Sequence, residues 1–366
     1  MSDFAIIPEL PTPPTFTLEP APPLLRGVPD RYVVIALPIL AYWAWSLMFY
    51  FFDTFNLFEK YRIHTPDEIK KRNLVPIREV ILCILIQQLW QVALGLWTYP
   101  GPYLVGQENY DIALWATTIR QKQQLVPNLL ALVGVNSKAV ALKIAPIAPS
   151  LAGFLHGGGL VVVTSQLMPG EMIKPAFAPW EIYLAKLIYY YAIPAVQFSV
   201  AIFIGDTWQY WMHRISHRVP WIYNNFHSVH HRVYCPYPFG AFYANLVEAF
   251  VWDVGGTALA LWFSRLNQRQ ALCFTTLSTM KSCDDHCGYN LPFDPLQWIN
   301  AQRAAYHDIH HQSWGMKTNF SQVYTTVWDW VLDTQWTGND TAERYKRGQL
   351  AAERAIRMEK GQSEGE

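Results

Sequence analysis

Histidine is the residue whose spacing most directly indicates chemistry in this chain of 366 residues. Nine of its 11 histidines lie between positions 213 and 311. They form an H-x-x-x-H motif, two H-x-x-H-H motifs and one isolated residue, namely His213 and His217; His227, His230 and His231; His307, His310 and His311; and His286. On a helix, side chains three or four residues apart share one face, so each motif can direct its imidazoles at a common point.

The repeated H-x-x-H-H motif favours metal binding over packing. A single H-x-x-x-H motif arises often by chance, whereas nine imidazoles buried only for packing would each need hydrogen-bond partners. Imidazole binds zinc, copper, iron and nickel. Two tetrahedral zinc ions would use about eight ligands and two octahedral ions about twelve. Nine histidines are more than two tetrahedral zinc ions would use. On two octahedral ions they leave open coordination positions, as activation of O2 requires, so the pattern favours two iron ions.

Imidazole must be neutral to bind a metal, and a second group usually orients its ring. We therefore expect metal loading to weaken below about pH 6. Five polar residues near the motifs could accept an imidazole N–H, although each could equally be a helix cap or a surface group. These candidates are Asp206, Tyr210, Asp284, Asp285 and Asp308.

Composition indicates an integral membrane protein. Hydrophobic residues make up 51% of the chain and charged residues only 15%, against about 25% charged in soluble domains, which excludes a disordered chain. The 28 basic and 28 acidic residues cancel, so nucleic acid is not an expected partner. Residues 33–52, 80–99 and 187–204 are apolar runs near the roughly 20 residues that a spanning helix needs. The predicted fold is all-α, with several spans and a histidine-rich helical cap.

The chain divides into four regions on this basis. They are a disordered Pro-rich N-terminus (1–30), a transmembrane region (31–205), a catalytic domain with a membrane hairpin near 241–280 (206–340) and a charged tail (341–366). The Gly- and Pro-containing stretch 128–179 leaves open an additional span. Glu248 and Asp253 lie in the first arm of the hairpin, where a carboxylate is costly unless it pairs or faces a polar cavity. A functional acid and a shallow, partly wet arm both remain open.

Basic residues set the expected topology. Six of them lie between positions 60 and 78, and such clusters remain on the cytoplasmic side of a membrane. The N-terminus is then luminal, and the histidine motifs face the cytosol. Asn319 and Asn339 begin glycosylation sequons, and this topology predicts that neither carries sugar.

The histidine motifs, set around a membrane hairpin, resemble those of the fatty acid hydroxylase superfamily of membrane di-iron oxygenases. Within it, five segments look like the sphingolipid C4-hydroxylases, or sphinganine C4-monooxygenases, of fungi and plants. These segments are residues 59–64 (EKYRIH), 206–210 (DTWQY), 226–231 (FHSVHH), 279–289 (TMKSCDDHCGY) and 306–311 (YHDIHH). The resemblance extends from about Tyr32 to Trp336.

The resemblance implies hydroxylation of sphinganine or dihydroceramide at the fourth carbon, with two iron ions held by the nine histidines. It also implies the endoplasmic reticulum membrane and electrons from NAD(P)H through cytochrome b5 and its reductase. An acidic donor could dock on basic residues near the histidines, which could equally bind lipid phosphates. These residues are Arg214, Arg218, Arg232, Arg303 and Lys317.

Two alternatives remain open at this point. The same histidine pattern could serve a sterol or acyl-chain oxidase or desaturase. The histidines could also store or carry zinc in a membrane protein without catalysis, although a transport path would place ligands within the spans.

Overall fold

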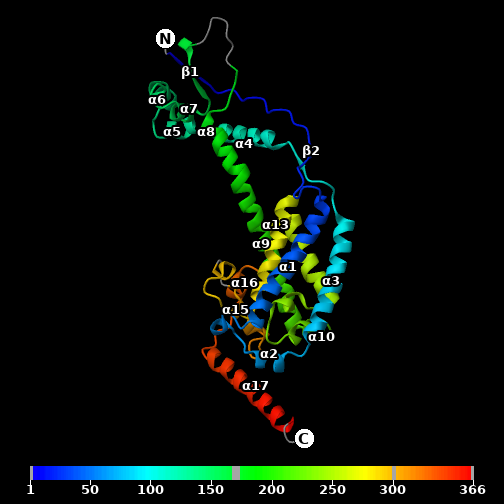
Figure 1. Ribbon diagram of the computed structural model, residues 1–366. Helices are drawn as coiled ribbons and strands as arrows, with labels where there is room; N and C mark the ends of the chain where they lie inside the picture. The colour runs from blue at the N-terminus through cyan, green and yellow to red at the C-terminus, as the bar shows by residue number, and fades with distance from the viewer. Residues whose placement is uncertain (1–2, 167–173, 299–301, 364–366) are drawn as a thin grey trace. The chain divides into compact units, whose positions relative to one another are not determined.

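The computed structural model is almost entirely helical (Figure 1). It describes residues 3–166, 174–298 and 302–363. The chain forms two compact units, which are residues 1–22 with 103–197 and residues 23–102 with 198–366. The nine motif histidines all belong to the second unit.

The first unit combines short helices with two small antiparallel strand pairs. Its helices are α4 (Glu108–Gln123), α5 (Val126–Ala131), α6 (Ser137–Ile144), α7 (Pro149–His156), the 3-10 helix η2 (Thr164–Gln166), α8 (Pro179–Leu187) and the π-helix η3 (Ile188–Ala192). Its strands are β1 (Phe4–Ile7), β2 (Glu19–Pro20), β3 (Leu104–Val105) and β4 (Leu160–Val163). Arg120 and Glu181 form a fully buried ion pair between α4 and α8.

Two findings in this unit bear on the sequence predictions. Disorder was expected throughout residues 1–30, but β1 pairs with β4 and β2 with β3. The apolar sequence of β1 fits the β-branched sequence of β4, an interaction between segments distant in the sequence. Helices α5, α6 and α7 have at most eight residues, too few to cross a bilayer. The described part of 128–179 therefore contains no span, and residues 167–173 lie outside the described residues.

The second unit carries long helices and the short segments that hold the histidines. Its elements are α1 (Asp30–Thr54), η1 (Glu59–Tyr61), α2 (Pro66–Arg72), α3 (Ile77–Thr98), α9 (Ile193–Arg218, in this unit from residue 198), α10 (Pro220–Asn225), η4 (His227–Arg232), η5 (Pro238–Phe242), α11 (Leu246–Ala249), the π-helix η6 (Phe250–Val254), α12 (Gly255–Ser264), α13 (Gln268–Asp285), α14 (Pro295–Trp298), α15 (Ala304–His311), α16 (Val327–Val331) and α17 (Thr341–Ser363).

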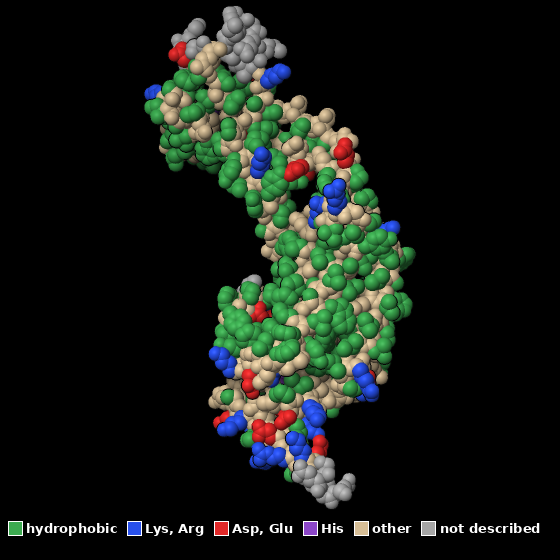
Figure 2. All heavy atoms as spheres, in the orientation of Figure 1, with side chains coloured by type: hydrophobic (Ala, Val, Ile, Leu, Met, Phe, Trp, Pro, Cys, Tyr) green, Lys and Arg blue, Asp and Glu red, His purple; other side chains and the backbone are tan. Residues whose placement is uncertain are grey.

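Four helices among the described residues are long and apolar enough to cross a membrane. They are Asp30–Thr54, Ile77–Thr98, Pro179–Arg218 and Leu246–Ser264. The first three overlap the predicted runs, which confirms a helical, multi-span membrane protein. In the second unit, Figure 2 shows hydrophobic side chains over the long helices and charged side chains gathered at the end that carries α17.

The predicted hairpin is only partly apolar. Its first arm is the candidate span Leu246–Ser264, and the chain then reverses at Arg265, which has a φ of 56°. The second arm, α13, is not among the candidate spans because it carries several hydroxyl side chains and Lys281. α13 packs against α1 instead, and its C-terminal end reaches the histidines.

An apolar cluster fixes the segments that follow η4. Tyr42 of α1 and Ile84 of α3 pack with Val233 and Phe239, and all four side chains are buried. The Tyr42 hydroxyl donates to the Phe239 carbonyl at 2.9 Å. Each large apolar side chain buried here contributes about 1.5–3 kcal/mol to stability. The loop between η4 and η5 is thereby held on the two spans.

The charged tail forms one helix of 23 residues, α17, which packs against α2. The sequence alone identifies this stretch only as a charged tail. α2 begins with a capping box in which Thr65 accepts from the Glu68 amide and Glu68 accepts from the Thr65 amide. α2 and α17 close the second unit on the side of α15.

Candidate metal centre

Four separate segments bring the nine motif histidines together. His213 and His217 lie on the last turns of α9, and the H-x-x-H-H trio from 227 to 231 forms η4. His286 caps the C-terminus of α13, and the trio from 307 to 311 occupies α15. The predicted residues are thus all placed at one site, including the isolated one.

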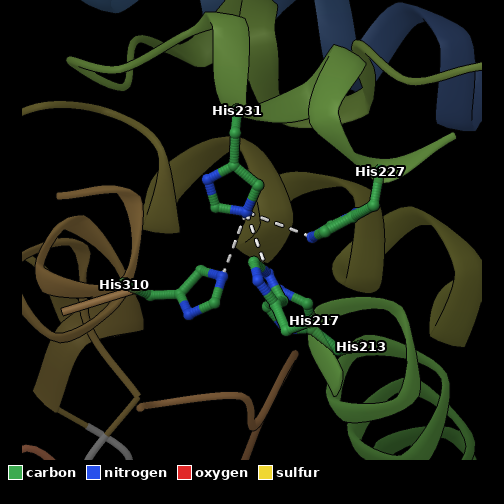
Figure 3. Close-up of side chains that lie close together, drawn as sticks. All are labelled: His213, His217, His227, His231 and His310. Atoms are coloured by element: carbon green, nitrogen blue, oxygen red, sulfur yellow. Dashed lines mark hydrogen bonds between the residues drawn. The ribbon is translucent and has the colours of Figure 1, made fainter. Parts of the chain in front are cut away.

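The imidazoles divide into two clusters. The five-histidine cluster contains His213, His217, His227, His231 and His310, and Figure 3 shows their rings converging. The four-histidine cluster contains His230, His286, His307 and His311. Within each cluster, the nitrogen atoms that could act as ligands lie within 4.8 Å of one another. Each H-x-x-H-H motif contributes to both clusters.

The Nε2 atoms approach one another closely within the clusters. In the five-histidine cluster, Nε2 of His231 lies 3.0 Å from that of His217, 3.1 Å from that of His227 and 3.3 Å from that of His310 (Figure 3). In the four-histidine cluster, Nε2 of His307 lies 3.0 Å from those of His286 and His311.

Backbone carbonyls accept from the opposite ring nitrogen of five histidines. Their Nδ1 atoms bond as follows: His213 to Phe320 (2.8 Å), His230 to Tyr243 (3.0 Å), His286 to Ser282 (2.9 Å), His310 to Thr318 (2.7 Å) and His311 to Val233 (2.9 Å). A carbonyl can only accept, so each Nδ1 carries the hydrogen and each Nε2 keeps a bare lone pair. Such partners fix the tautomer and the orientation of metal-binding imidazoles.

The carboxylate that orients a ring is Glu248. Its Oε1 lies 2.5 Å from Nδ1 of His227, and both side chains are buried. The sequence left open whether Glu248 is a functional acid or lies in a shallow, partly wet arm, and the cost of a charge within an apolar arm was the signal that pointed to it. The pairing itself carries no sequence signature, because 21 residues separate the two positions.

Among the described residues, none of the five candidate orienting groups is hydrogen-bonded to a motif histidine. Asp206 accepts backbone N–H groups of residues 323–325, and the Tyr210 hydroxyl contacts Thr334 and Arg214. Asp285 pairs with Lys281. Asp284 has no hydrogen-bond partner for either carboxylate oxygen among the described residues, and Asp308 faces away from the clusters.

Asp308 contacts His64, a residue to which the sequence assigned no role. Nε2 of His64 lies 2.9 Å from Oδ2 of Asp308, and Nδ1 lies 3.4 Å from Glu68. The Tyr345 hydroxyl of α17 donates to Asp308 at 2.6 Å. Burial opposes a charge on His64, but the Asp308 carboxylate raises its pKa well above the ordinary value. A buried imidazolium thus ties the helix α15 to α2 and α17.

Burial keeps the clustered imidazoles neutral. All nine rings except that of His217 are buried. Burial lowers the pKa of His230 to about 4, and burial together with the neighbouring imidazole of His230 lowers the pKa of His286 to about 3. Neutral imidazole is the form that binds metal, so the clusters are ready to bind at neutral pH.

The two clusters fit two metal ions. Bare Nε2 lone pairs that face one another at about 3 Å repel unless a cation lies among them. Nε2 of His213 is buried and has no hydrogen-bond partner within the part of the chain that the structure describes, although buried polar atoms are nearly always satisfied. Five and four imidazoles also leave open positions on octahedral ions.

The remaining surface residues singled out in the sequence are placed as follows. Arg218, Arg232, Arg303 and Lys317 are exposed, whereas Arg214 donates to the Tyr210 hydroxyl at 2.8 Å. Asn319 is only 1% exposed, and its amide bonds Tyr306 and Trp336. A glycan on Asn319 is incompatible with this fold, so the exposed Asn339 is the sequon that can report the topology of the folded protein.

Spanning helices and paired histidine clusters together define a membrane protein with a histidine-rich site suited to two metal ions, and comparison with known proteins identifies its class. The sequence matches the fatty acid hydroxylase family over residues 198–334. It is 33% identical over 336 residues to the sphingolipid C4-hydroxylase of Saccharomyces cerevisiae, covering 91% of this chain and 80% of the relative. The sphingolipid C4-hydroxylase of Schizosaccharomyces pombe is 36% identical over 309 residues, covering 82% and 87%.

A shorter match links the chain to plants. Sphinganine C4-monooxygenase 2 of Arabidopsis thaliana is 43% identical over 140 residues, covering 38% of this chain and 54% of the relative. No solved structure matches. The chain belongs to the sphingolipid C4-hydroxylase branch of the fatty acid hydroxylase superfamily, as the sequence motifs predicted. It is a membrane enzyme, an oxygen-dependent hydroxylase.

Proposed function

We propose that the protein hydroxylates the fourth carbon of sphinganine or dihydroceramide, which gives phytosphingosine-type sphingolipids. The observation that carries this proposal is the convergence of nine imidazoles into clusters of five and four, in a chain related over most of its length to sphingolipid C4-hydroxylases. Hydroxylation of an unactivated carbon needs a strong oxidant, and a paired metal site is one way to obtain it.

Two iron ions are the proposed metals, with His213, His217, His227, His231 and His310 holding one and His230, His286, His307 and His311 the other. Bound iron supplies the activation of O2 that insertion of oxygen into a C–H bond requires. The protein holds the rings in place through the backbone carbonyls and Glu248, while burial keeps bulk water from the site. Selection of one carbon among many then depends on where the lipid chain is held.

The electrons are proposed to come from NAD(P)H through cytochrome b5 and its reductase, because O2-dependent hydroxylation consumes two electrons per turnover. Exposed Arg218 and Arg232 flank histidine motifs and suit an acidic donor. The basic segment between residues 60 and 78 supports a cytosolic location for the histidines, in the endoplasmic reticulum membrane.

Expression in cells that lack 4-hydroxylated long-chain bases tests the function. Wild-type protein should restore those bases, detected by mass spectrometry of total sphingoid bases. His311→Ala should not restore them, whereas His156→Ala, a histidine outside both clusters, should. Unchanged bases with altered sterols or acyl chains would refute the proposed substrate. Purified protein with tight zinc, no iron and no oxygen-dependent turnover would indicate a zinc carrier instead.

A further inference from the structure

A pocket beside the four-histidine cluster carries several polar side chains besides the imidazoles. His286 and His307 line it, together with Gln209 of α9, Asp253 of η6 and Ser282 of α13. The pocket therefore shares its wall with the proposed metal centre. A molecule that occupies it lies next to the site of oxidation.

Asp253 is the carboxylate of this pocket that no basic side chain neutralises. It lies within the candidate span Leu246–Ser264, where a carboxylate is costly and by default indicates function. Glu248, on the same span, pairs with His227. Gln209 lines the same pocket and its amide donates to the Trp252 carbonyl at 3.4 Å, and among the described residues no Lys or Arg lies within ion-pair distance of Asp253.

The other acidic residue that lines the pocket is already paired. Asp285 forms an ion pair with Lys281, whose ammonium also donates to the Gln302 carbonyl at 3.1 Å. The π-helical segment η6 that carries Asp253 is a rare conformation, and such segments occur often at functional sites. A cation that enters the pocket therefore meets one available carboxylate, that of Asp253.

The chemistry of a long-chain base matches this arrangement. Its amino group is on the second carbon, and about 4 Å separates that nitrogen from the fourth carbon when the intervening bonds are extended. A fourth carbon placed beside His286 and His307 brings the nitrogen into the same pocket. In the free base this nitrogen is an ammonium group, whereas in the N-acylated lipid it is a neutral amide with a second chain attached.

We propose that Asp253 binds the ammonium group of a free long-chain base, so that the enzyme prefers the free base to its N-acylated form. This inference rests on the proposed C4-hydroxylation. A charge-assisted bond in a pocket away from bulk water is strong, and an amide nitrogen cannot replace it. The same contact holds the fourth carbon at a fixed distance from the imidazoles of the four-histidine cluster.

The test compares sphinganine with N-acylsphinganine in membranes that contain wild-type protein, Asp253→Asn or Asp333→Asn. The readout is the ratio of kcat/KM for the two substrates, measured by mass spectrometry of the 4-hydroxylated products. This ratio does not depend on how much protein is folded or loaded with metal. Asp333 is exposed and outside the pocket, so its variant is a matched control.

Wild-type protein and Asp333→Asn should favour sphinganine, and Asp253→Asn should reduce the ratio about 10- to 100-fold, the effect of losing a hydrogen bond to a charged group. Asp253→Glu keeps the charge and should keep the preference. Equal losses on both substrates, an unchanged ratio in Asp253→Asn, or a wild-type preference for N-acylsphinganine would overturn the inference. Absence of 4-hydroxylated product from either substrate with wild-type protein would instead refute the proposed function.

Discussion

Removal of the Glu248 carboxylate should weaken metal binding in the five-histidine cluster. Its Oε1 lies 2.5 Å from Nδ1 of His227, and Glu248→Ala leaves that buried N–H without an acceptor. Loss of such an orienting partner typically reduces metal affinity about 10- to 100-fold, or about 1.4–2.8 kcal/mol. Glu248→Gln retains an acceptor oxygen without the charge, so its loss should be smaller.

The assay is competition between purified protein in detergent and a chelator of known iron affinity, with iron per chain measured by elemental analysis. Glu343→Ala, an exposed glutamate on α17, is the control and should match wild type. If Glu248→Ala binds iron at both sites as tightly as wild type does, the proposal that this carboxylate orients a ligand is refuted. Equal weakening by Glu248→Gln and Glu248→Ala would show that charge, rather than the presence of an acceptor, is the important property.

Two other predictions concern stability. His64→Ala leaves the buried Asp308 carboxylate without a cation, whereas Glu68 keeps Arg72, and it should lower the free energy of unfolding by about 3–5 kcal/mol. Thermal unfolding beside His156→Ala measures this, and equal stability of the two variants would contradict the buried pair. The folded-state pKa values of His230 and His286 lie near 4 and 3, below the unfolded value of about 6.5, so the unfolded chain binds more protons in this window. Metal-free protein should therefore lose stability as the pH falls from about 6.5 towards 4. A melting temperature that does not change with pH across this range would contradict this prediction. His64, whose pKa is raised, stays protonated in the folded chain throughout the window, so it opposes this loss only near pH 6.5, where the unfolded chain is still partly deprotonated at this residue.

The spans and the histidine site were largely predictable because their signals are local. Apolar runs in the sequence predict three of the four candidate spans. A spacing of three or four residues places imidazoles on one face wherever the segment is helical. The division into clusters of five and four was not predictable. His230 and His231 are adjacent in sequence yet belong to different clusters, since the direction of each ring depends on the turn of η4.

Partners that are distant in the sequence explain what was missed. Asp308 was one candidate for orienting a motif imidazole, but its partner is His64, 244 residues away in the sequence. The groups that do orient the rings are mostly backbone carbonyls, which every residue has and no sequence motif reveals. The strand pairing of residues 4–7 with 160–163 is equally non-local, and neither segment indicates its partner.

The iron content of purified wild-type protein tests the two-cluster centre most directly. We predict two iron ions per chain by elemental analysis, with one lost in His213→Ala and the other in His286→Ala. A single ion per chain, zinc in place of iron, or full iron content in both variants would contradict the two-cluster centre.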